Sequence, residues 1–465
     1  MGVTSITFLY FFLPVVIIAY FAIPGIRAKN YILLFASLFF YAWGDLNSIW
    51  VLVSVAVLDY ISGLAFIKIE KPALRSTFLA ISVLIRIGIL AGINLALHYK
   101  FEPVDGFSLF SAIPIGLSFF MFRSISYVSE IYLEVITPTR NFADYLFYLS
   151  FFPVIIAGPI VRYSELEEEM ASRKFSALNI SNGLVRISTG LIKKIVIADS
   201  LEPLTRQFLT VDPGSGSLSL LFGLIIFSLQ IYYDFSGYTD IVIGIASLFG
   251  FTLPENFNYP YFSRSVSEFW RRWHITLGSF FRDFVFIPLS LVRSKFNIII
   301  SLAVVWSLTG LWHGFTLNFL LWGVYFGIFI AAEIYLLKRF LPRLPVIFQH
   351  FYLLLVVVTG WSLFYFRDMD KLTEFYRILF SFQPGSIMVD LSLQQALITH
   401  LPVILVALVF VFPVGELFRK YYADYEERFP SATYGLRVIF TLAALFFSTA
   451  LLLDRSFNPF LYGGF

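Results

Sequence analysis

The chain has 465 residues, of which 33 are lysine or arginine and 30 are aspartate or glutamate, so only 14% of it is charged. A soluble globular chain carries about 25% charged residues, whereas 58% of this chain is hydrophobic and 56 of its residues are phenylalanine. A soluble globule of this size cannot bury that much apolar surface. The composition therefore excludes a soluble enzyme and predicts an integral membrane protein in contact with the lipid bilayer.

The formal net charge is only +3. With charges confined to loops, so small an excess reflects orientation in the membrane, and we expect no nucleic-acid partner. The chain has no cysteine, which excludes disulfides, cysteine–zinc sites and thiolate catalysis. The sequence shows no glycine-rich phosphate loop, nucleophile elbow or metal-ligand cluster, so we expect no metal site.

Apolar runs of spanning or near-spanning length recur along the chain and predict about 11 to 14 membrane helices or half-helices. They are continuous rather than alternating, which favours an all-α, multi-pass fold over a β-barrel. We expect one domain, residues 1–465, with N-terminal helices over 1–110, a core over about 111–340 and C-terminal helices over about 341–465. The runs lie near residues 6–23, 31–43, 49–67, 77–97, 108–122, 143–161, 183–198, 217–250, 284–292, 298–314, 316–336, 351–366, 401–413 and 436–453.

The first loops predict the orientation of the chain. The N-terminus has no basic segment or cleavage site of a signal peptide, so the run near 6–23 is expected to stay as the first helix. Asp45 is the only charge between the second and third runs, whereas basic residues follow the first and the third. Basic loops stay in the cytoplasm, so the N-terminus is expected outside. The basic residues are Arg27, Lys29, Lys68, Lys71 and Arg75.

Two later runs are interrupted by proline, glycine and charge, namely PVIIAGPIVRY (153–163) and IYYDFSGYTD (231–240). Non-helical backbone at membrane depth is tolerated only inside protein or along a water-filled cavity. These interruptions predict a central funnel.

Five histidines are candidates for chemistry, and His313 is the most informative. It lies in WSLTGLWHGFTLNFLLWG (306–323), a stretch without formal charge. An ionisable residue at membrane depth indicates function, and a neutral imidazole can accept a proton near pH 7. The alternative is a structural histidine that bonds a carbonyl of a neighbouring helix. The other candidates, His98, His350 and His400, lie at the ends of apolar runs, where a structural role is expected.

His274 lies in SEFWRRWHITLGSFFRD (267–283), which is amphipathic and aromatic if helical. Arg271 and Arg272 beside Trp270 and Trp273 could hold phosphates and stack on a purine, as an acyl-coenzyme A site requires. The alternative is an anchor at the membrane surface.

Asp234 and Tyr238 lie inside a long apolar run. Burial of a carboxylate is costly unless it is paired or solvated, so Asp234 is expected to face the funnel or to form a structural pair with an arginine. Arg162 is the candidate partner. Asn256 and Asn258, in PENFNYPYF (254–262), either order a loop or bind substrate.

Six ordered motifs, taken together, resemble the membrane-bound O-acyltransferase family. Within it the chain is similar to the bacterial polysaccharide O-acetylation branch, which includes alginate O-acetylation. The motifs are PIGLSFFMFRSISYVSEIY (114–132), YLSFFPVIIAGPIVRY (148–163), GLIKKIVIAD (190–199), QIYYDFSGYTDIVIG (230–244), LPENFNYPYFSRSVSEFWRRWHITLGSFFRDFVFIPL (253–289) and GLWHG (310–314).

The resemblance implies an hourglass of helices in the bacterial inner membrane, with two funnels that meet at a catalytic site in the core. It implies acetyl-coenzyme A as a cytoplasmic donor substrate, no tightly bound cofactor, and an acceptor on the outer side. His313 matches the family's active-site histidine in its tryptophan-histidine-glycine motif, which includes Trp312, and His274 matches the second position. In this branch a hydrolase-like partner with a serine, histidine and aspartate site (SGNH type) usually passes the acetyl group to the polysaccharide.

On this reading His313 is the base for the acceptor hydroxyl, worth about 10²- to 10⁴-fold in rate, and His274 helps to stabilise the oxyanion. An acetyl-histidine intermediate stays open. The alternatives are direct acylation of a lipid or small glycoconjugate, a transporter or flippase for lipid-linked sugars, and a non-catalytic scaffold.

Overall fold

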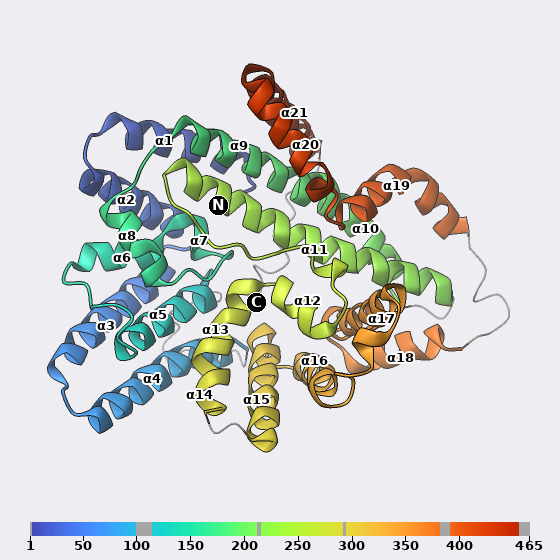
Figure 1. Ribbon diagram of the computed structural model, residues 1–465, viewed down its shortest axis with the longest axis horizontal. Helices are drawn as coiled ribbons and strands as arrows, with labels where there is room; N and C mark the ends of the chain where they lie inside the picture. Colours follow the sequence, from blue (N-terminus) through green and yellow to red (C-terminus); the bar gives the residue numbers. More distant parts are fainter. Residues whose placement is uncertain (1, 99–113, 212–214, 292–293, 382–390, 455–465) are drawn as a thin grey trace, which may run out of the picture. The chain divides into compact units, whose positions relative to one another are not determined.

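The computed structural model describes residues 2–98, 114–211, 215–291, 294–381 and 391–454 (Figure 1). Over these residues the regular elements are helices. Phe257 and Trp273 also form an isolated antiparallel β-bridge. The predicted all-α fold is confirmed.

The chain forms two compact units. The first unit contains residues 1–187 and 239–254, and the second contains residues 188–238 and 255–465. Two helices, α9 and α11, contribute residues to both. The predicted division at about residues 110 and 340 stays a prediction.

The first unit is held by a buried polar network. The carboxylate of Asp59 accepts hydrogen bonds from Arg86 at 2.5 Å, from Ser124 at 2.6 Å and from Tyr145 at 2.5 Å. Asp59 and Arg86 are both fully buried, and each satisfies the other's charge. The helices that begin in this unit are η1 (Phe8–Phe12), α1 (Leu13–Ala22), α2 (Ile26–Gly44), α3 (Ser48–Lys68), α4 (Pro72–His98), α5 (Leu117–Tyr132), α6 (Phe142–Ser150), α7 (Phe152–Ile155), α8 (Tyr163–Ala171) and α9 (Ala177–Leu191).

The second unit contains α12, α15, α16 and α17, which lie beside one another (Figure 1). Glycines at 310 and 323 let α15 and α16 approach closely, because a Cβ atom at either position would meet backbone of the other helix. The helices that begin in this unit are η3 (Ile192–Ala198), α10 (Asp199–Phe208), α11 (Ser217–Leu248), η4 (Pro260–Phe262), α12 (Val266–Arg272), α13 (Ile275–Phe281), η5 (Arg282–Phe286), α14 (Ile287–Leu289), α15 (Lys295–His313), α16 (Leu317–Tyr335), η6 (Leu341–Arg343), α17 (Val346–Tyr365), α18 (Met369–Leu379), α19 (Leu391–Phe410), α20 (Val414–Arg428) and α21 (Pro430–Asp454).

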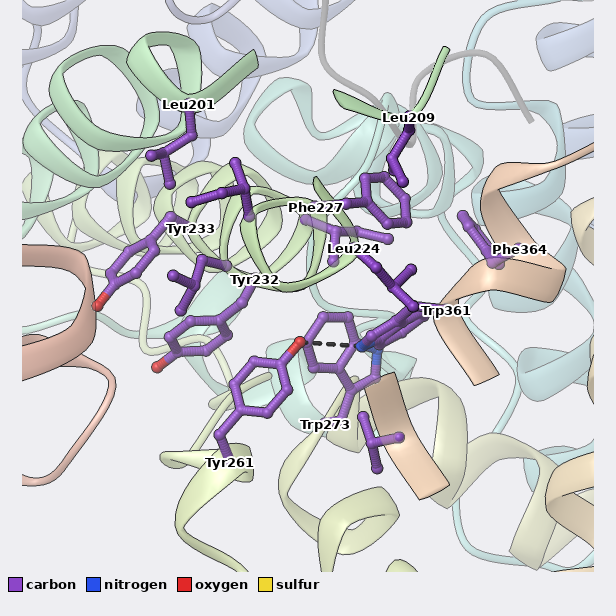
Figure 2. Close-up of a cluster of buried hydrophobic side chains, with 14 of the residues drawn as sticks. Leu201, Leu209, Leu224, Phe227, Tyr232, Tyr233, Tyr261, Trp273, Trp361 and Phe364 are labelled. Carbon is purple, nitrogen blue, oxygen red and sulfur yellow. Dashed lines mark hydrogen bonds between the residues drawn. The ribbon is translucent and has the colours of Figure 1, made fainter. Parts of the chain in front are cut away.

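An aromatic core supports this unit (Figure 2). The indole of Trp361 donates a hydrogen bond to the hydroxyl of Tyr261 at 2.9 Å, and that hydroxyl donates to the carbonyl of Ser228 at 2.6 Å. The buried polar ends of the two large rings are therefore satisfied. Trp273 packs against Trp361 in the same core, with ring centroids 4.9 Å apart.

Eight helices within the described residues are long and apolar enough to cross a membrane: α3, α4 up to Leu95, α11, α15, α16, α17, α19 and α21. The helix over Phe8–Ala22 is apolar but shorter. A multi-pass membrane protein is thus confirmed, and the exact number of crossings, the orientation and the central funnel stay predictions.

One predicted interruption is wrong. The segment 231–240 lies within α11, which continues as one helix from Ser217 to Leu248. Gly237 does not break this helix but allows close packing, since a Cβ atom there would lie 2.8 Å from the carbonyl oxygen of Gly190. The interruption at 153–163 is observed: α7 ends at Ile155, and Gly158 has φ +121°.

Candidate active site

His274 lies between α12 and α13 in a strained backbone conformation. Its φ and ψ are +45° and +56°, in the left-handed region that is costly for a residue with a Cβ atom. The conformation is fixed by pairing with the segment around Asn256: Phe257 and Trp273 form the antiparallel bridge, and the amide of Ile275 donates to the carbonyl of Asn256 at 3.0 Å. Strain of this kind persists where the surrounding structure enforces it, and it is concentrated at functional sites.

The side chain of Asn256 binds the imidazole of His274. Oδ1 of Asn256 lies 3.1 Å from Nδ1 of His274 and accepts hydrogen bonds from the main-chain N–H of Thr276 at 3.2 Å and from its hydroxyl at 3.0 Å. Asn256 is 1% exposed. Of the two roles predicted for Asn256, it orders this loop, whereas Asn258 is exposed.

His274 lies in none of the eight candidate spans, and burial lowers its pKa from 6.5 to about 3. Its imidazole is therefore neutral near pH 7, with one N–H group. Because Nδ1 donates that hydrogen to Asn256, Nε2 carries a lone pair and cannot donate a hydrogen bond. The predicted role of His274 as a donor to an oxyanion stays a prediction, since it requires the other tautomer or the imidazolium.

His313 ends α15 and is 4% exposed. Its imidazole is surrounded by four aromatic rings, with centroid distances of 4.4 Å to Trp312, 5.0 Å to Trp322, 5.0 Å to Phe364 and 6.0 Å to Phe319. An apolar enclosure of this kind favours the neutral imidazole, which is the form able to accept a proton.

Trp312 connects the two histidines. Its indole lies 5.9 Å from the ring of His274 and 4.4 Å from the ring of His313, measured between centroids. Phe235 of α11 packs edge-on against His274 at 4.8 Å. The two histidines predicted from separate motifs thus lie at one buried aromatic site.

The arginines and tryptophans that were predicted to bind the donor differ in their exposure and their contacts. Trp273 is 2% exposed and stacks on Phe269, so it has no free ring face for a purine and the predicted stacking role is corrected. Trp270 is half-buried and packs against Trp306, Trp322 and Phe326. Arg271 is exposed, whereas Arg272 is half-buried and paired with Glu268 at 2.7 Å.

Asp234 forms an ion pair with a lysine. Nζ of Lys194 lies 2.5 Å from Oδ1 of Asp234 and 2.7 Å from Oδ1 of Asp199, and the side chains of Lys194 and Asp234 are 1% and 2% exposed. Asp234 is thus in an ion pair, but the predicted arginine partner is wrong, because the cation is Lys194. The signal for it was available, because Lys194 lies inside the apolar run 183–198.

The remaining predicted residues lie elsewhere. Tyr238 is 4% exposed, within α11. Arg162 precedes α8, and its main-chain N–H donates to Oε2 of Glu165 at 2.8 Å. Among the residues that the structure describes, no group of three or more histidine, aspartate or glutamate side chains is placed to bind a metal ion.

Comparison with known proteins supports the motif analysis. The model of the membrane-bound O-acyltransferase family matches residues 133–368. The chain is 33% identical over 438 residues to a probable alginate O-acetylase of Azotobacter vinelandii, covering 90% of this chain and 86% of that protein. It is 31% identical over 369 residues to a peptidoglycan O-acetyltransferase of Helicobacter pylori, covering 70% and 69% of the two chains.

A further relative is a teichoic acid D-alanyltransferase of Bacillus subtilis, 26% identical over 232 residues, which cover 47% of this chain and 58% of that protein. The range matched by the family contains His274, Trp312 and His313.

Proposed function

We propose that this chain, which belongs to the membrane-bound O-acyltransferase family, moves an acetyl group from cytoplasmic acetyl-coenzyme A to a hydroxyl group outside the membrane. The acceptor is a cell-surface polysaccharide, reached through a partner protein. The observation that carries the proposal is the contact of His274 and His313 with one indole, that of Trp312, in a buried aromatic site. The names of the relatives, which concern alginate, peptidoglycan and teichoic acid, support an envelope polymer as the acceptor.

The chemistry requires a base. An acceptor hydroxyl has a pKa far above 7, so a positioned base must take its proton as the oxygen attacks the thioester carbon. We assign this step to His313, whose aromatic surroundings favour the neutral form. The C–S bond then breaks, and the leaving thiolate takes the proton. In the alternative route, His313 carries the acetyl group as an acyl-imidazole, which predicts a burst of free coenzyme A before the acceptor arrives.

Donor binding and orientation belong to the same proposal. Arg271 is exposed beside the site and can hold the donor's phosphates as a planar, bidentate group. The basic residues after the first and third apolar runs support cytoplasmic loops there, with the N-terminus outside, in the bacterial inner membrane. An SGNH-type hydrolase-like partner on the outer side would then receive the acetyl group.

Sealed proteoliposomes test the donor and the partner. Acetyl-coenzyme A with a labelled acetyl group is added on the side that exposes the basic loops, with and without the partner on the opposite side. The proposal predicts donor consumption and label on the partner or its polysaccharide. Label in the lipid fraction without a partner would favour direct acylation of a lipid. No donor consumption in either arm, with movement of a lipid-linked sugar, would favour the flippase.

A further inference from the structure

We propose that Asn256 is a positioning residue for the acyl transfer: it holds His274 as the Nδ1–H tautomer and thereby makes Nε2 of His274 a second proton acceptor at the site. This inference rests on the proposed function and deepens it, since it assigns His274 a role different from the oxyanion donor predicted from the motif.

The hydrogen bonds of Asn256 determine the tautomer. A main-chain N–H can only donate, so the atom of Asn256 that lies 3.2 Å from the amide nitrogen of Thr276 is its carbonyl oxygen. The same oxygen lies 3.1 Å from Nδ1 of His274. A carbonyl oxygen only accepts, so Nδ1 carries the hydrogen and Nε2 the lone pair.

Two independent observations point to a reacting partner for Nε2. His274 is only 3% exposed. Within the residues that the structure describes, its buried Nε2 has no hydrogen-bond partner. Buried polar atoms are almost always satisfied in proteins, so an exception indicates a ligand, a water molecule or a catalytic role. The second observation is the strained, left-handed backbone of His274, at φ +45°, which also costs conformational free energy.

As the acceptor's oxygen bonds to the acetyl carbon, its O–H bond breaks and the proton passes to Nε2 of His274. The proton passes either directly or by way of the imidazole of His313. The C–S bond breaks, and the thiolate receives the proton. While His274 is an imidazolium, the Nδ1–H bond to Asn256 is charge-assisted and therefore stronger, which stabilises the transient cation.

Few charged groups face His274. The elements that pack on it are α11 through Phe235, α15 through Trp312 and the segment around Asn256, where Glu255 is exposed. On α11 the neighbouring carboxylate of Asp234 is paired with Lys194, and α15 contributes His313. On its own segment, Arg272 is paired with Glu268 and Arg271 is exposed. A carboxylate introduced at position 256 would therefore be the anion nearest to the imidazole.

The test compares Asn256→Asp and Asn256→Ala with two controls. Asn256→Asp keeps an oxygen for all three donors but adds a negative charge, which raises the pKa of a neighbouring histidine by about 1 to 3 units. Asn258→Ala changes the exposed neighbour, and Thr276→Val removes one bond to Asn256 but keeps the bond to His274. Rates of acetyl transfer are measured from pH 4.5 to 9 in lipid nanodiscs, with folding checked by thermal melts.

The pKa of His274 in the wild type is about 3, so its acid limb lies below the measured range, and a rise of about 1 to 3 units should bring an acid limb of kcat into that range in Asn256→Asp. We expect kcat to fall about 10- to 100-fold in Asn256→Ala with little change in KM for acetyl-coenzyme A. Asn258→Ala should resemble the wild type, and Thr276→Val should lose less activity than Asn256→Ala, because Asn256 keeps its bond to His274. A folded Asn256→Asp protein without an acid limb in the measured range, or Asn256→Ala that behaves like Asn258→Ala, would overturn the inference and leave His313 as the sole base.

A second readout does not depend on activity, so it separates this inference from the proposed function. Solid-state NMR of the protein labelled with ¹⁵N-histidine, with the His274 signals identified by their loss in His274→Asn, reports the tautomer. The Nδ1–H form at pH 7 supports the inference even if no acetyl transfer is found. The Nε2–H form overturns it even if transfer depends on His313.

Discussion

Nζ of Lys194 lies 2.5 Å from Oδ1 of Asp234, and the two side chains are 1% and 2% exposed. The pair ties η3 to α11, the helix that carries Phe235 against His274. A buried ion pair contributes little net stability, but removal of one partner leaves a buried charge uncompensated. The pair therefore fixes the position of α11 more than it strengthens the fold.

Lys194→Met should destabilise the protein by about 3 to 5 kcal/mol, because the buried carboxylate of Asp234 loses its ion pair with Lys194. The double variant Lys194→Met with Asp234→Asn should recover part of that loss, because Asp199 still loses its ion pair with Lys194. Thermal melts in detergent measure both. Arg377→Met, which breaks the exposed pair with Glu374, is the control, since exposed ion pairs contribute little to stability. Equal melting temperatures for Lys194→Met and Arg377→Met would contradict the prediction.

Gly237→Ala should impair folding, because the new Cβ atom would lie 2.8 Å from the carbonyl oxygen of Gly190 and from the amide nitrogen of Lys194. Gly435 of α21 is the matched control, since a Cβ atom there would have no atom within 4 Å. There alanine should be neutral or stabilise the helix by up to about 1 kcal/mol. Yield and melting temperature of the two variants check the contrast, and similar values for both would show that the approach at Gly237 is not tight.

Stability should depend on pH through His274. Its pKa is lowered by burial to about 3 in the folded state, against 6.5 in the unfolded chain, so the unfolded chain alone takes up the proton between these values. The contribution of His274 is present above pH 6.5 and is lost as the pH falls toward 3. Between pH 7 and pH 5 the loss is about 2 kcal/mol.

The variant His274→Asn measures that contribution, because asparagine tolerates a left-handed backbone and does not titrate in this range. Its melting temperature should fall less between pH 7 and pH 5 than that of the wild type. The same fall in both proteins would mean that His274 is not held neutral by the fold.

The histidines and most of the helices could be predicted because they depend on local pattern. Long apolar runs predict helices, and a histidine in an uncharged stretch indicated His313. The continuity of α11 could not be predicted, since Gly237 reads as a break until the backbone of Gly190 is known to lie against it. The same holds for Asn256: its bond to His274 depends on a bridge between segments whose pairing no periodicity indicates.

We propose that this chain is an acetyl-coenzyme A-dependent acyltransferase whose reaction depends on His313. The most direct test is acetyl transfer by purified protein in lipid nanodiscs, with the partner added, for the wild type, His313→Ala and His400→Ala. His400 lies on α19, with Nδ1 3.3 Å from the carbonyl oxygen of Ala396, and serves as the control histidine. We predict transfer by the wild type and His400→Ala, and loss of at least about 100-fold in folded His313→Ala. Near-normal transfer by His313→Ala would show that the reaction does not depend on His313.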